Sequence, residues 1–336
     1  MLSVYGFPFM LAMFVSFVLT PHIKKLAFKI GAVDKPDNRK VHKRIMPRLG
    51  GLAIYIAFMI AVVAGMEMSW DIFGILLGGK VIVALGVADD VYQLPAKVKL
   101  LGQIVAACIL VAFDIRIEWV NNPLGGYFYL DMLSIPFTIF WVISFINVVN
   151  LIDGLDGLAA GVSAIASLTI ILVAIQMGYF HVAVLTAALA GAIIGFIRYN
   201  FNPATIFMGD TGSMFIGYIL AAISVYGAVK TAATIALIVP AIALGLPILD
   251  TAFAIMRRYV NGRPIFQPDK GHLHHRLLAT GMSHKETVLF MYGITAVLCI
   301  GAVLWAEMDG VYAALIIAVI MTAVAIGAKK IGILND

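Results

Sequence analysis

Residues 147–161 read NVVNLIDGLDGLAAG and place four hydrogen-bonding side chains between strongly apolar segments. These side chains are the amides of Asn147 and Asn150 and the carboxylates of Asp153 and Asp156. A charged side chain at the centre of a bilayer costs about 2.5–3.5 kcal/mol on insertion scales. Residues of this kind are therefore expected to lie near water or to serve a reaction.

Three other segments carry polar groups of similar kinds. They read GVADDVYQLPAKVKLLGQ, RYNFNPATIFMGDTGS and RPIFQPDKGHLHHRLLATG. Their candidate functional residues are Asp89, Asp90, Lys97, Lys99, Asp210, His272, His274, His275 and Arg276.

Several carboxylates with an amide oxygen are hard ligands that suit Mg²⁺, an ion that bridges phosphate oxygens. Lysine, arginine and histidine donate hydrogen bonds to a diphosphate. In phosphoryl transfer, catalysis is mostly positioning and electrostatic stabilisation, and a spare carboxylate can accept a proton or attack phosphorus. The residues alone therefore predict a Mg²⁺-dependent phosphoryl-transfer site, and the apolar setting predicts a lipid as one substrate.

Each cluster also has a structural explanation. Asn147 and Asn150 lie on neighbouring positions of one helix face and could join two helices, and Asp210 could cap a helix. A histidine-rich tract is often a solvated loop. Adjacent acids at the end of a helix, such as Asp89 and Asp90, oppose the helix dipole, which disfavours a purely structural role. If all clusters meet at one membrane face, these separate structural explanations become weaker, because independent structural roles would not all select the same face.

The elements that must position these groups are membrane helices. Of the 336 residues, 62% are hydrophobic and 12% are charged, and the mean hydropathy is +1.02. A soluble protein carries about 25% charged residues. The predicted fold is an all-α polytopic membrane protein forming a single domain over residues 1–336. About 20 apolar residues span a bilayer, which predicts eleven helices, with ten as the alternative, near 3–21, 50–66, 72–88, 99–114, 132–149, 157–177, 181–197, 210–228, 232–256, 287–305 and 311–328.

The basic residues predict the orientation of these helices. Twenty of the 23 lysines and arginines fall on one side of an eleven-helix arrangement, from the first loop to Lys329 and Lys330. Cytoplasmic loops carry the excess of basic residues. We therefore expect the N-terminus outside, the C-terminus in the cytoplasm and all polar clusters at the cytoplasmic face. The net charge of +5 needs no nucleic-acid partner.

The motifs DDVYQLPAKVKLLGQ, NVVNLIDGLDGLAAG, FMGDTGS and HLHHRL occur in that order between Val33 and Gly281. Together they resemble the polyprenyl-phosphate N-acetylhexosamine-1-phosphate transferase family. The resemblance implies transfer of a sugar 1-phosphate from a UDP-sugar to undecaprenyl phosphate, with release of UMP. It leaves open whether the lipid phosphate attacks directly or an aspartyl-phosphate intermediate forms.

The resemblance also implies roles for individual residues. Asp210 resembles, by its place in the motif, the principal Mg²⁺ ligand of the family, and Asn150 would be a second ligand. Mn²⁺ could replace Mg²⁺. Asp89 resembles the carboxylate that deprotonates the lipid phosphate, Asp90 lies beside it, and Asp153 belongs to the polar centre. The implied uracil contacts are Gly154, Leu155, Asp156 and Phe207, and Asn147 is a further substrate contact with no part of the substrate assigned to it. Lys97 and Lys99 are implied at the lipid phosphate, and His272, His274, His275 and Arg276 at the donor diphosphate.

Two elements resemble the branch that uses UDP-N-acetylglucosamine. The first loop reads RKVHKRIMPRLGG, and the histidine loop is interrupted as HLHHR. The segment PDKGHLHHRLLATGMSH resembles enzymes that start teichoic acid synthesis, although another UDP-N-acetylhexosamine or a muramyl-peptide donor stays open. The implied setting is the bacterial plasma membrane with surrounding lipids and a cytoplasmic active site, and a homodimer is one option for its assembly.

The main alternative from another class is a secondary transporter. Its binding site should lie near the bilayer midplane, on broken helices within an inverted repeat. The sequence contains no evident repeat. A non-enzymatic scaffold would leave the acidic clusters unexplained. Two intramembrane charges, Lys80 and Asp250, stand outside this account. Lys80 could extend toward the interface, be paired or be functional, and Asp250 could support the site residues together with Arg257 or face the cytoplasmic cavity.

Overall fold

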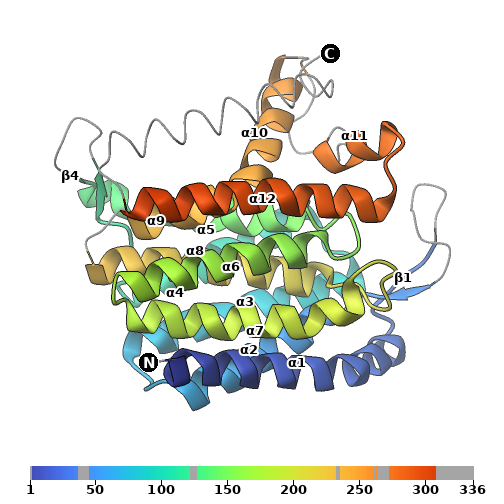
Figure 1. Ribbon diagram of the computed structural model, residues 1–336, viewed down its shortest axis with the longest axis horizontal. Coiled ribbons are helices and arrows are strands. Elements are labelled where there is room, and N and C mark those ends of the chain that lie inside the picture. The colour runs from blue at the N-terminus through green and yellow to red at the C-terminus, as the bar shows by residue number, and fades with distance from the viewer. Residues whose placement is uncertain are drawn as a thin grey trace.

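The computed structural model describes residues 2–36, 45–121, 127–231, 235–260, 262 and 272–307. Within these ranges the chain is a helical bundle with two short two-stranded sheets (Figure 1). The helices are α1 (Leu2–Ile30), α2 (Gly50–Gly65), α3 (Trp70–Tyr92), α4 (Ala96–Ala112), α5 (Ser134–Leu151), α6 (Leu158–Gln176), α7 (Phe180–Asn200), α8 (Gly209–Thr231), α9 (Ile235–Ala243), α10 (Gly245–Val260), α11 (Leu273–Ala279) and α12 (His284–Glu307).

The strands are confined to the ends of the bundle. Strands β1 (Val33–Asp34) and β2 (Met46–Pro47) pair antiparallel between α1 and α2. Strands β3 (Trp119–Asn121) and β4 (Tyr127–Tyr129) form a second antiparallel pair, followed by a 3₁₀ turn, η1 (Asp131–Leu133). These small sheets were not expected from the sequence, but they leave the helical architecture intact.

Seven described helices are long and apolar enough to cross a membrane, or eight if a bent pair counts as one span. This confirms the predicted class, a polytopic helical membrane protein. Nine of the predicted spans coincide with single described helices, including the shorter α2 and α4. The predicted span 311–328 and the tail residues Lys329 and Lys330 lie outside the described residues, so the total of eleven stays a prediction.

The predicted span 232–256 is not one helix, which corrects the sequence interpretation. Its described part divides into α9 and α10, which are bent by 74° relative to each other. Pro247 has no N–H to donate to the carbonyl of Ala243, four residues earlier, and its ring crowds that carbonyl. Helix α9 ends at Ala243, and α10 leaves the direction of the bundle (Figure 1).

Helix α8 lies at the centre of the bundle, where it contacts α2, α3 and α5. Its first turn approaches the backbones of α2 and α3 at positions that only glycine allows. A Cβ on Gly51 would overlap the backbone at Gly212, and a Cβ on Gly86 would overlap the backbone of Thr211. This close approach places the start of α8 beside the end of α3.

Candidate active site

Three carboxylates that are far apart in the sequence meet at one end of the bundle. Asp89 and Asp90 lie in the last turn of α3, and Asp210 lies in the first turn of α8. One oxygen from each carboxylate lies within 4.8 Å of the others. Asp89 and Asp90 are buried, whereas Asp210 is half-buried. The cluster lies at helix ends and not at mid-helix, unlike the midplane site expected of a transporter.

Two cations lie against the carboxylates: Arg48 reaches all three, and Lys99 reaches two of them. The Nη2 atom of Arg48 lies 3.0 Å from Asp90, 3.7 Å from Asp210 and 3.8 Å from Asp89. The ammonium of Lys99 lies 2.9 Å from Asp210 and 3.4 Å from Asp89. The cluster therefore contains two fixed positive charges among three negative ones.

Arg48 comes from the first loop, and a backbone contact places it in the site. Residue Arg48 forms a parallel bridge with Phe207, whose N–H donates to the carbonyl of Pro47 at 2.8 Å. The N–H groups of Gly50 and Gly51 donate in turn to the carbonyls at 207 and 208. This short ladder joins the PRLGG segment to the residues that precede α8.

Asp90 differs from its two neighbours because its oxygens are already occupied. Its Oδ1 accepts from Arg48 Nε at 3.0 Å and from the Asp210 N–H at 3.0 Å. Its Oδ2 accepts from the Thr211 N–H at 3.1 Å and the Thr211 hydroxyl at 2.6 Å. Asp90 therefore caps the N-terminus of α8 from another helix and holds Arg48 at the same time.

Asp89 and Asp210 retain acceptor capacity directed at the cluster. Asp89 uses Oδ1 to accept from the Leu94 N–H at 2.8 Å, and its Oδ2 faces Lys99. Asn150 donates to the Ser213 hydroxyl at 2.8 Å, a contact that engages its amide nitrogen and not its oxygen. Two carboxylates with an amide oxygen nearby are a donor set that fits a hard divalent cation.

The other predicted amide has a different environment. Asn147 donates to Gln103 on α4 at 2.9 Å and to the carbonyl of Ile143 in its own helix at 2.8 Å. Gln103 also donates to the sulfur of Met214. In the structure Asn147 thus joins α5 to α4, as the interhelical interpretation of the sequence allowed.

The turn between α5 and α6 contains the next group of predicted residues. The Asp156 carboxylate accepts from Asn202 at 3.2 Å and from the Ala204 N–H at 3.0 Å, and Leu155 is buried. Asp153 is half-buried. Burial, and then the charge of Asp210, raises the pKa of the Asp153 carboxyl well above its usual range.

The predicted histidine loop is helical in the structure: His272 is the N-cap of α11, and His274, His275 and Arg276 lie in that helix. Residues 272–276, which we continue to call the histidine loop, pack against this turn. His272 and His274 are buried with parallel rings 5.9 Å apart, whereas His275 and Arg276 are half-buried. A Cβ on Gly154 would lie 2.7 Å from Nε2 of His274, so the glycine leaves room for the ring. Burial, and then the neighbouring His275, lowers the pKa of His274 to about 3, and the ring is neutral at physiological pH.

The structure separates the two predicted lysines: Lys99 joins the acidic cluster, but Lys97 is exposed. Sequence reasoning assigned no individual site role to Arg48, Gln103 or His284. His284 accepts the Asp156 N–H at 2.9 Å. Arg48 and Gln103 stand within the quoted PRLGG and KLLGQ motifs, so a signal was present without a way to assign partners.

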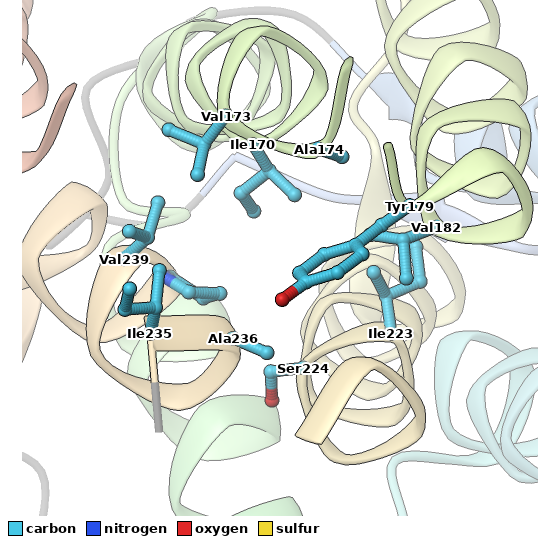
Figure 2. Close-up of a pocket in the computed structure, with 11 residues that line it drawn as sticks. Ile170, Val173, Ala174, Tyr179, Val182, Ile223, Ser224, Ile235, Ala236 and Val239 are labelled. Carbon is cyan, nitrogen blue, oxygen red and sulfur yellow. The ribbon is translucent and has the colours of Figure 1, made fainter. Parts of the chain in front are cut away.

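A separate apolar cavity lies between α6, α7, α8 and α9 (Figure 2). The hydroxyl of Tyr179 points into it, whereas the Ser224 hydroxyl accepts from Trp141 and donates to the Ala221 carbonyl. Ser224 follows Asp210 by fourteen residues on α8, a separation of about 21 Å at 1.5 Å per residue. The cavity is therefore remote from the acidic cluster.

Fold and site together define a polytopic helical membrane protein with an acidic cluster and two cations at one end of its bundle. Residues 72–228 match the family described as Glycosyl transferase family 4. The chain is 41% identical to the "Probable undecaprenyl-phosphate N-acetylglucosaminyl 1-phosphate transferase" of Bacillus subtilis, over 98% of this chain and 92% of that protein.

Two further relatives extend this similarity. A "Decaprenyl-phosphate N-acetylglucosaminephosphotransferase" of Mycobacterium tuberculosis is 36% identical over 87% of this chain and 80% of that protein. A "Phospho-N-acetylmuramoyl-pentapeptide-transferase" of Thermoanaerobacter is 32% identical over 85% of this chain and 95% of that protein. The chain belongs to glycosyl transferase family 4, and the family predicted from its motifs is confirmed.

Proposed function

We propose that the protein transfers N-acetylglucosamine 1-phosphate from UDP-N-acetylglucosamine to undecaprenyl phosphate and releases UMP. The observation that carries this proposal is the convergence of Asp89, Asp210, Arg48 and Lys99 at the ends of α3, α8, the first loop and α4. Such a group of acids and cations serves a reaction between two phosphate-bearing substrates. Starting a wall polymer such as teichoic acid is the proposed physiological role.

Asp210 and Asn150 are the proposed ligands of a Mg²⁺ ion, for which Mn²⁺ can substitute. When bound, the ion would neutralise charge on the donor diphosphate during transfer. The half-buried position of Asp210 supports this role, because a diphosphate can approach its exposed edge. The histidines and Arg276 of the neighbouring loop are the proposed donors of hydrogen bonds to the same diphosphate.

Asp89 is proposed to accept the proton of the lipid phosphate. A phosphate oxygen of the lipid then attacks the phosphorus attached to the sugar, and the bond from that phosphorus to the UMP oxygen breaks. Lys99 lies between Asp89 and Asp210 and can neutralise the incoming phosphate. Asp90, with its oxygens occupied, is proposed to position Asp210 and Arg48 without taking the proton itself.

Two observations support N-acetylglucosamine over the muramyl-peptide donor. Relatives named for N-acetylglucosamine are 41% and 36% identical to the chain, and those named for the muramyl-pentapeptide are 32% and 30% identical. The PRLGG segment also contributes Arg48 to the acidic cluster. The distribution of lysine and arginine supports eleven spans, with this cluster in the cytoplasm.

The test is an assay of purified protein with UDP-N-acetylglucosamine, undecaprenyl phosphate and Mg²⁺. We expect stoichiometric release of UMP and formation of a lipid-linked sugar diphosphate, with far lower turnover of the UDP-muramyl-pentapeptide. Equal turnover of the two donors would refute the donor assignment while leaving the reaction class intact. Uptake of a solute into vesicles without any UMP release would favour the transporter.

A further inference from the structure

Asp250 is a buried carboxylate outside the acidic cluster. It lies in α10 shortly after the bend that separates α9 from α10, and only 6% of its surface is exposed. A carboxylate buried this deeply must be hydrogen-bonded, because an unpaired buried charge is strongly destabilising. The partners of Asp250 therefore indicate what this residue does.

Both oxygens of Asp250 accept hydrogen bonds from the start of the histidine loop. Oδ2 lies 3.0 Å from Nδ1 of His272, and Oδ1 accepts from the Leu273 N–H at 2.8 Å. Helix α11 begins without a side-chain cap from its own N-cap residue, His272. Asp250 thus supplies that cap from another helix and also orients the His272 ring.

A carboxylate that only accepts requires a proton on Nδ1 of His272, and in the neutral ring Nε2 is then the acceptor nitrogen. The His272 ring is stacked on that of His274, which in turn lies against Gly154. Asp250 is consequently the first member of a chain of contacts from the bent helix pair to the turn between α5 and α6.

We propose that Asp250 is a positioning residue that fixes the tautomer and location of His272, and through it the histidine loop that grips the donor diphosphate. The kinetic part of this inference rests on the proposed function. The structural part, the Nδ1–H tautomer of His272 and the capping of α11, does not depend on it.

The first experiment is ¹⁵N NMR of the full-length protein labelled at its seven histidines. The His272 signals are assigned by their loss in His272→Gln. We expect the Nδ1–H form in the unaltered protein and a shift to Nε2–H in Asp250→Asn, because the amide nitrogen would then face Nδ1 as a donor. An Nε2–H form in the unaltered protein overturns the inference, even if Asp250→Asn fails to fold.

The second experiment compares the kinetics of Asp250→Asn with a matched control. We expect a rise of about tenfold in KM for UDP-N-acetylglucosamine, the size of a lost charge-assisted hydrogen bond, with kcat within about threefold. The KM for the lipid phosphate should not change. Thr251→Val is the control, because among the described residues the Thr251 hydroxyl bonds within its own helix, to the Pro247 carbonyl at 2.9 Å.

A double variant tests whether Asp250 acts through His272. Asp250→Asn combined with His272→Gln should have the same donor KM as His272→Gln alone, since the residue to be positioned is already gone. Full additivity, or an unchanged donor KM in Asp250→Asn, overturns the inference. If the unaltered protein releases no UMP, the proposed function fails, and the NMR result still decides the role of Asp250.

Discussion

Asp90→Asn should mainly reduce stability and Asp210→Asn should mainly reduce turnover, although oxygens of the two carboxylates lie within 4.8 Å of each other. The Asp90 side chain is fully buried and bonded to Arg48, to Thr211 and to the Asp210 N–H. An asparagine keeps the shape of the side chain but loses its charge, and its NH₂ group would face N–H or O–H donors that now bond the carboxylate. Breaking a buried ion pair costs about 3–5 kcal/mol.

The expected loss for Asp90→Asn lies near the lower end, about 3 kcal/mol, because Arg48 keeps Asp210 and Asp89 within 4 Å. A displaced α8 terminus would also move Asp210, and a misplacement of about 1 Å can reduce the rate about 100-fold. Asp210→Asn gives up a partly exposed ion pair with Lys99 but also removes one of three clustered acids, so its stability should change by less than about 1 kcal/mol. Its turnover should fall by about three orders of magnitude or more, because metal stabilisation is worth several kcal/mol.

Unfolding by SDS titration from mild-detergent micelles measures the stability, and UMP release measures turnover. Excess Mg²⁺ or Mn²⁺ should restore part of the activity of Asp210→Asn but none of that of Asp90→Asn. If Asp90→Asn is as stable as the unaltered protein while Asp210→Asn is strongly destabilised, the two roles have been exchanged and the reasoning is wrong.

Three further predictions, made with four variants, test neighbouring parts of the site. Lys99→Ala should lower kcat/KM for the lipid phosphate about 100-fold, because Lys99 lies in the acidic cluster. Lys97 is exposed, and Lys97→Ala should change kcat/KM less than about threefold. Similar losses in the two variants would contradict the different roles given to the two lysines. Gly154→Ala should raise the donor KM about tenfold, since its Cβ would displace His274, and an unchanged KM would show that the ring moves freely. The pKa of Asp153 is raised in the folded protein, so ionisation of this carboxyl destabilises the fold as the pH rises above the pKa of the unfolded chain. Asp153→Asn should therefore raise Tm at about pH 7 but not at about pH 4. An equal shift of Tm at both pH values would refute this.

Apolar patterning was sufficient to locate the helices, because seven described helices, or eight with the bent pair, contain an apolar window long enough for a bilayer, and α2 and α4 are shorter helices at predicted positions. The bend between α9 and α10 was missed, although Pro247 carried the information. A length criterion treats a proline like any apolar residue, whereas a proline removes one helical hydrogen bond. Helix α1 nevertheless continues through Pro8 and Pro21, so a proline marks a candidate bend that only the folded chain decides.

The partners within the site were a different problem. Arg48 and Asp90 are 42 residues apart and meet through a backbone bridge to Phe207, which no local pattern predicts. Asp250 likewise bonds a histidine 22 residues away, across segments that change direction. Residue types indicated which chemistry to expect, but the division of labour among the three clustered acids required the hydrogen bonds of the folded chain.

The two cations of the cluster are suited to different tasks. Arg48 bonds Asp90 through two of its nitrogens, and a planar guanidinium held in this way is a fixed part of the scaffold. Lys99 shares one ammonium between Asp89 and Asp210, and its flexible stem allows that charge to move toward an incoming phosphate. We infer that binding of the lipid phosphate draws Lys99 away from the two carboxylates. Under the proposed function, this movement would free Asp89 for its proposed proton-accepting role and would leave Asp210 available as a metal ligand, so one residue would link acceptor binding to the donor site.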